Sequence, residues 1–320
     1  MSPRAPKSPG TSKPWIKPLK AVVAISALYL VFRKVPFASV GPALANCRLD
    51  LLALVLALQI ATVVAQAVRW KMLLRGSGLP LQKFLYFVFM GQFLSLFVPS
   101  ALASDAMKVV AFGRKYGGTQ ENIGIALLSK LEGMLVQLIF GAIGIALYAD
   151  ELTAKGAFAH LHLNGKLPAL SAAAAGVAAL LAWVFRKRWL GQTWLRTIWT
   201  LAQDRKLLWQ TFSLSFTIQS LSAFGLYFLM LSVQPGVRFW EIVLLTTVTQ
   251  AVLLLPFAFG GVGVREYLNL LLFTDIAGIP ANTVLAASLL GYVPWLCMAL
   301  IGGAWMAYRK WWGAAEMERV

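Results

Sequence analysis

The chain has 320 residues, of which 59% are hydrophobic and only 13% are charged, and its mean hydropathy is +0.72. A soluble domain carries about twice that share of charge, so the composition excludes a soluble catalytic domain and predicts an all-helical protein that crosses a membrane repeatedly. The net charge of +17 does not indicate nucleic acid, because Lys and Arg lie in the short connections between apolar runs, where they set topology and contact anionic lipids.

The two ends of the chain are polar and the rest is one unit. Residues 1–18, which are rich in Pro and Lys, predict a disordered basic tail in the cytoplasm. Residues 19–310 predict a single integral membrane domain, and 311–320 predict a short cytoplasmic tail. Within the domain we expect two pseudo-repeats, at about 19–148 and 168–308.

Apolar runs and charged connections predict the elements in order. A first helix begins near Trp15 and includes the apolar run 21–32. Arg69 and Trp70, near the end of the next helix, are typical of an anchor at the membrane surface. Segments 105–116 and 186–206 are amphipathic, and the second is basic and aromatic, as expected for a segment on an anionic leaflet. Further apolar helices are expected at 49–74, 81–98, 121–148, 168–185, 207–231, 239–255 and 282–307.

Two of the apolar runs are interrupted in the same way. Each ends in a proline, continues through small residues and reaches a charged pair, and the nine-residue step from Pro99 to Lys108 equals that from Pro256 to Arg265. A helix break within lipid leaves backbone groups unpaired, and only protein or water can satisfy them. Paired breaks in two halves of a chain are typical of a transporter site. The alternative is two ordinary loops between helices. The expected breaks are Pro99 in the first run and Pro256, Gly260, Gly261 and Gly263 in the second.

The distribution of charge bears on the topology. Eight full spans would place the basic segment 186–206 outside and the nearly neutral loop 149–167 inside, against the positive-inside rule. If 81–105 and 240–266 are instead re-entrant, the main basic connections fall inside. The sequence therefore predicts a polytopic helical bundle of six full spans plus two broken, re-entrant elements in an inverted repeat, with both termini cytoplasmic.

These segments resemble the flippase-like lysylphosphatidylglycerol synthase transmembrane family. The resemblance is carried by Arg69-Trp70, by Gly91-Gln92-Phe93 through Pro99 to Asp105, and by Pro256 through Gly260-Gly261-Val262-Gly263-Val264-Arg265-Glu266. It implies a stand-alone protein of the bacterial cytoplasmic (inner) membrane that moves lipids or lipid-linked sugars, and a hopanoid-associated group exists within the family. The family's Gly-Gly-Asp and middle-helix Asp-Arg appear here as Ala103-Ser104-Asp105 and Ser129-Lys130, a departure that favours a less anionic substrate such as a hopanoid.

The resulting hypothesis is a lipid transporter and not an enzyme. Glu266 would neutralise Arg265 when the site is empty, and Asp105 and Lys108 would form the matching pair. The partners expected are membrane lipids, including anionic headgroups, and proteins of lipid biosynthesis or export; no metal or cofactor is expected. The alternatives are a scaffold for a lipid-biosynthesis enzyme, a lipid transferase, or ion pairs that only hold two broken helices together. The candidate substrate-binding residues are Gln92, Asp105, Lys108, Lys130, Glu132, Gln250, Arg265 and Glu266.

Overall fold

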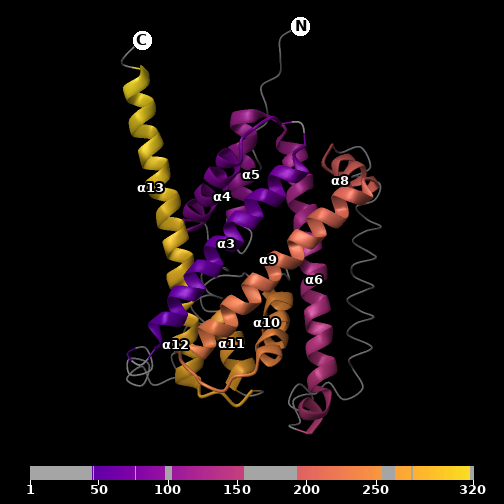
Figure 1. The fold of residues 1–320 in the computed structure, drawn as a ribbon, viewed down its shortest axis with the longest axis vertical. Helices are drawn as coiled ribbons and strands as arrows, with labels where there is room; N and C mark the ends of the chain where they lie inside the picture. The colour runs from indigo at the N-terminus through magenta and orange to yellow at the C-terminus, as the bar shows by residue number, and fades with distance from the viewer. Residues whose placement is uncertain are drawn as a thin grey trace, which may run out of the picture.

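The structure, a computed structural model, describes residues 45, 47–75, 77–97, 103–154, 193–253, 264–274 and 277–317. The described residues form helices and turns with no strand, which confirms the all-helical prediction (Figure 1). The tail 1–18, the first predicted helix, the helix predicted at 168–185 and the five predicted break residues Pro99, Pro256, Gly260, Gly261 and Gly263 lie outside the described residues.

The helices follow the predicted ranges closely. Their bounds are α3 Leu49–Leu73, α4 Leu81–Ser95, α5 Ala103–Tyr116, α6 Thr119–Ala154, α8 Thr193–Gln203, α9 Arg205–Leu231, α10 Phe239–Leu253, α11 Val264–Asn269, the π-helical turn η2 Leu270–Thr274, α12 Ala281–Leu290 and α13 Tyr292–Met317.

Four helical segments in the described part of the chain are long and apolar enough to cross a membrane. They are Leu49–Leu73, Thr119–Gly144, Arg205–Leu231 and Ala281–Tyr308. Each coincides with one of the six predicted full spans, and the other two predicted spans lie outside the described residues. The chain is therefore a multi-pass membrane protein.

Two helix boundaries differ from the predicted ones. The last span is interrupted by a turn at Gly291, between α12 and α13, because Pro294 has no N–H to donate to the carbonyl of Leu290. The span predicted to end at 148 continues as α6 to Ala154. The predicted stop after α5 is confirmed, since Gly117 and Gly118 both adopt positive φ (80° and 67°), a conformation that side chains disfavour.

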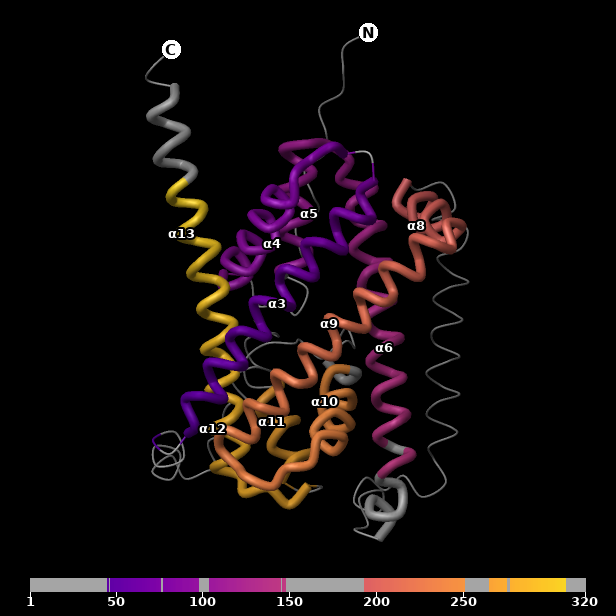
Figure 2. The backbone as a smooth tube through the Cα atoms, in the orientation of Figure 1, coloured from indigo at the N-terminus to yellow at the C-terminus, as the bar shows by residue number. Residues whose placement is uncertain are grey.

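The long helices α3 and α9 pack against each other and cross the middle of the molecule, whereas the short helices lie at its two ends (Figures 1 and 2). Helices α4 and α5 occupy one end of the long axis, and α10, α11 and α12 occupy the other. A core cluster around Phe84 joins α3, α4, α5 and α6 with α13, and a second core cluster around Phe273 joins α9 to α12.

Glycines allow close contacts between helices of the two halves of the chain. Helix α4 packs on α13 and α10 packs on α6. A Cβ atom at Gly302 of α13 would lie 2.1 Å from the carbonyl oxygen of Phe89 in α4. A Cβ atom at Gly144 of α6 would lie 2.9 Å from Cβ of Leu244 in α10. The short helices α4 and α10 are thus each held by a long helix that comes from the other half of the chain.

Candidate functional site

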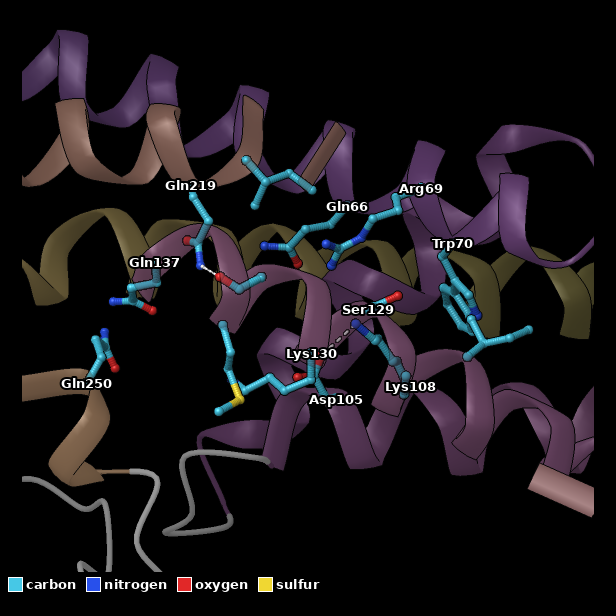
Figure 3. Close-up of a pocket in the computed structure, with 15 residues that line it drawn as sticks. Gln66, Arg69, Trp70, Asp105, Lys108, Ser129, Lys130, Gln137, Gln219 and Gln250 are labelled. Carbon is cyan, nitrogen blue, oxygen red and sulfur yellow. Dashed lines mark hydrogen bonds and ion pairs between the residues drawn. The ribbon is translucent and has the colours of Figure 1, made fainter. Parts of the chain in front are cut away.

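A cavity lies where polar side chains from four apolar helices and the amphipathic helix α5 converge. It has a volume of about 170 Å³ and is bounded by α3, α5, α6, α9 and α10 (Figure 3). Clustered polar groups on apolar helices need one another or a ligand, because lipid cannot satisfy them. We call it the Asp105 cavity. Its polar lining residues are Gln66, Arg69, Asp105, Lys108, Ser129, Lys130, Gln137, Gln219 and Gln250.

The charged end of the Asp105 cavity is predominantly positive. Lys108 Nζ lies 2.6 Å from Asp105 Oδ1, so the predicted pair from one turn of α5 is present. The Asp105 carboxylate also interacts electrostatically with Lys130 of α6 and Arg69 of α3. Among the described residues that line the cavity, three are therefore cationic and one, Asp105, is acidic.

Trp70 forms one wall of the charged end. Its ring is 5% exposed and packs edge-on against Phe84, with the ring centroids 5.4 Å apart. Its Nε1 donates a hydrogen bond to Asn122 Oδ1 at 3.2 Å, and Lys108 Nζ lies 5.8 Å from its ring centroid, within cation–π range. The interpretation of Arg69 and Trp70 as a surface anchor is therefore wrong, because both residues face the interior of the bundle.

Arg265 lies in a second group of cavities toward the other end of the molecule. One of them, of about 300 Å³, is lined by Gln59, Thr246, Arg265 and residues of α6 and α9, and we call it the Arg265 cavity. A neighbouring cavity of about 300 Å³ also reaches Arg265 and has mostly apolar walls from α3, α9 and α13. A polar end beside an apolar one suits an amphipathic molecule.

Three glutamines line both the Asp105 cavity and the Arg265 cavity. They are Gln137 of α6, Gln219 of α9 and Gln250 of α10, and we call them the glutamine neck. Figure 3 shows their amides on the side of the cavity away from Trp70 and Lys108. Gln219 Nε2 donates a hydrogen bond to the carbonyl of Gly133 at 2.7 Å, which fixes one amide of the neck. The two charged regions are thus neighbours joined through uncharged polar groups.

The predicted site residues divide into two groups. Asp105, Lys108, Lys130 and Gln250 line the Asp105 cavity, and Arg265 lies beyond the neck. Three others line none of these cavities. Gln92 lies on α4; Glu132 is 6% exposed between α6 and α9; Glu266 is 4% exposed and accepts a hydrogen bond from the hydroxyl of Tyr292. Neutralisation of Arg265 by Glu266 stays a prediction.

Sequence reasoning missed part of the lining, although the spacing carried a signal. Gln59 and Gln66 of α3 are seven residues apart and Arg69 follows three later, so all three lie on one helical face. Lys130 and Gln137 show the same seven-residue step in α6. Gln219 of α9 carried a similar signal, because Ser215 lies four residues before it and Ser222 three residues after it. Among the described residues no group of His, Cys, Asp and Glu could hold a metal ion.

Comparison with known proteins identifies a family over most of the length. The model of the lysylphosphatidylglycerol synthase TM region matches residues 19–302. The match includes both cavities and the four apolar spans almost completely. No curated protein matches the chain.

Proposed function

Because this chain belongs to the family of lysylphosphatidylglycerol synthase transmembrane regions, we propose that it transports a lipid with an anionic headgroup across the cytoplasmic membrane. The observation that carries the proposal is the excess of positive charge in the Asp105 cavity. Among the described residues, Arg69, Lys108 and Lys130 face two acidic partners, Asp105 in the lining and Glu132 behind Arg69, so the cations outnumber the acids by one. Cations kept at such a cost in an apolar bundle are stabilised when an anion binds, and a phosphate can accept several charged hydrogen bonds at once.

The charge of the cavity also bears on which lipid is carried. The departures from the family pattern at Ala103, Ser104 and Ser129 favoured a hopanoid. A hopanoid need not carry an anionic group, so it would not account for this excess of positive charge. The lining therefore supports a lipid that bears a phosphate over a neutral lipid. A glycolipid with a phosphate would also fit.

The glutamine neck supports movement of the headgroup between the two cavities. Each amide offers both donors and an acceptor. A phosphate or a sugar could therefore pass from the cations of the Asp105 cavity to Arg265 without losing all hydrogen bonds. The apolar cavity beside Arg265 would receive part of the lipid tail.

The packing supports the inverted repeat as the framework for this movement. Helices α4 and α10 have 15 residues each, a length of about 22 Å at 1.5 Å per residue, which is short of a hydrocarbon core of about 30 Å. They lie at opposite ends, and each packs on a long helix of the other half. In this proposal the two halves rock against each other around the glutamine neck, as in alternating access.

Cysteine labelling tests the topology. Gln120, after the turn that follows α5, and Pro235, between α9 and α10, are exposed. With Cys47 and Cys297 replaced by serine, we expect a membrane-impermeant maleimide to label Pro235→Cys in intact cells and to label Gln120→Cys only after lysis. Labelling of both positions from one face would contradict the inverted repeat.

A transport assay tests the function. In proteoliposomes, the protein should move fluorescent phosphatidylglycerol between leaflets, and Lys108→Gln and Lys130→Gln should each slow transport by roughly tenfold, since a charged hydrogen bond contributes about 1.5 kcal/mol or more. Lys71→Gln is the matched control, because Lys71 is exposed on α3 and outside the cavity lining. Purified protein that moves no lipid, or that chemically modifies one, would instead favour an accessory subunit or a transferase.

A further inference from the structure

Glu132 is a buried carboxylate with defined partners outside the cavity lining. It is 6% exposed and lies on α6 facing α9. Thr211 Oγ1 donates a hydrogen bond to Glu132 Oε1 at 2.6 Å, and Ser215 Oγ lies 2.8 Å from Glu132 Oε2. Thr211 and Ser215 are both fully buried (0%). A carboxylate in such a place holds a negative charge that needs cationic compensation.

Ser215 links this carboxylate to the Asp105 cavity. Arg69 Nη1 donates a hydrogen bond to Ser215 Oγ at 2.8 Å. A hydroxyl has one proton, and the Thr211 carbonyl oxygen also lies 2.7 Å from Ser215 Oγ. The ionised carboxylate is the stronger acceptor, because hydrogen bonds to charged groups are about twice as strong as neutral ones. Ser215 can therefore accept from Arg69 while it donates to Glu132.

The chain of contacts orients the Arg69 guanidinium. Arg69 interacts electrostatically with Glu132 as well as with Asp105, so two acidic side chains compensate its charge. A guanidinium has five N–H donors in a planar fork. Fixing one of them on Ser215 sets the plane of the fork and leaves the other donors for a ligand in the cavity that Arg69 lines. Lys108 is held separately, by Asp105.

We propose that Glu132 and Ser215 are positioning residues, which hold the Arg69 guanidinium in the orientation that binds the phosphate of a lipid headgroup. This inference rests on the proposed function and deepens it, because it names two residues of α6 and α9 that act on the headgroup only through Arg69. It also explains why a seryl hydroxyl, a threonyl hydroxyl and a glutamate are all buried at one contact between two apolar helices.

Binding measurements test the chain of contacts from Glu132 through Ser215 to Arg69, which we call the relay. Detergent-purified protein is titrated with short-chain phosphatidylglycerol by calorimetry. We expect Ser215→Ala to weaken binding about tenfold, the loss that one charged hydrogen bond predicts, and Glu132→Gln to weaken it similarly. Thr211→Val also removes a hydrogen bond to Glu132, but one that does not lead to Arg69, and it should leave the affinity unchanged. Ser213→Ala is the control for helix α9, since its exposed hydroxyl bonds only the Trp209 carbonyl among the described groups.

Coupling separates a positioning role from a merely structural one. In an Arg69→Lys background the fork is absent, so Ser215→Ala should then have little further effect on the affinity. Additive losses, or equal losses in Thr211→Val and Ser215→Ala, would overturn the relay and leave the site intact. No binding of phosphatidylglycerol by the wild-type protein would overturn the proposed function and the relay with it.

Two further probes identify the source of the phosphate. Short-chain phosphatidylcholine tests whether net negative charge is needed, and glycerol phosphate tests whether the lipid tails are. Selective binding of phosphatidylglycerol supports the inference as stated. Equal binding of glycerol phosphate would overturn the lipid as the ligand, and equal binding of phosphatidylcholine would overturn selection by net charge.

Discussion

Replacing Arg265 with alanine should reduce lipid transport at least about a hundredfold while the protein still accumulates in the membrane. Arg265 lines the Arg265 cavity and two neighbouring cavities on the far side of the glutamine neck from Lys108. A bidentate contact with a phosphate contains two charged hydrogen bonds, each of which contributes about 1.5–3 kcal/mol. Without the guanidinium, the headgroup would leave the Asp105 cavity with no cation to receive it.

The measurement compares transport in proteoliposomes with the amount of protein in the membrane. Arg265→Lys should keep part of the activity, because it keeps the charge but loses the fork. Arg196→Ala is the matched control, since Arg196 is exposed on α8, away from all these cavities. If Arg265→Ala protein is absent from the membrane while Arg196→Ala protein is present, Arg265 holds helices together. The transport hypothesis then loses the cation that would receive the headgroup beyond the glutamine neck.

Replacing Gly302 with alanine should destabilise the fold more than the same change at Gly144 or Gly225. The new Cβ would lie 2.1 Å from the Phe89 carbonyl oxygen and 2.6 Å from its carbonyl carbon, so it would meet backbone and not a movable side chain. Overpacking typically costs about 1–3 kcal/mol, and a backbone obstacle places this change at the upper end. Helices α13 and α4 would have to separate, and the core cluster around Phe84 would lose contacts.

Thermal unfolding in detergent, followed by size-exclusion chromatography, measures this effect. The matched control is Gly225→Ala in α9, where a Cβ would meet nothing within 4 Å. That substitution should leave the midpoint unchanged or raise it, because alanine is the better helix former by up to about 1 kcal/mol. Equal midpoints for the two variants would show that the contact between α13 and α4 is not as close as described.

The sequence predicted the elements well because length and hydropathy are local properties. The spans around α3, α6 and α9 begin and end within a few residues of the predicted positions, apart from the longer end of α6. The short helices α4 and α10 were predicted as apolar runs that end at Pro99 and Pro256. The two prolines themselves lie outside the described residues. The interruption at Gly291 was missed, although Pro294 was visible, because the apolar run continues through it.

Part of the candidate site was also predicted from the sequence, but from residue type and not from hydropathy. Asp105, Lys108, Lys130 and Gln250 were chosen because charge and amides are unusual in apolar runs, and they do lie together. Arg69 was assigned to the membrane surface because it lies near a helix end beside Trp70. The spacing from Gln59 and Gln66 marks the polar face of α3 on which Arg69 lies, but what that face meets depends on the rotation of α3 against α9.

By itself, the amino-acid sequence determined that this protein is a multi-pass helical membrane protein, where most of its spans lie and where two apolar runs are interrupted, because each of these depends on residues close together in the chain. Only the tertiary structure decided which polar residues share a cavity, that three glutamines join the two charged regions, and that Glu132 reaches Arg69 through Ser215. Successive helical residues point about 100° apart, so the faces that meet are fixed by how distant helices cross and rotate.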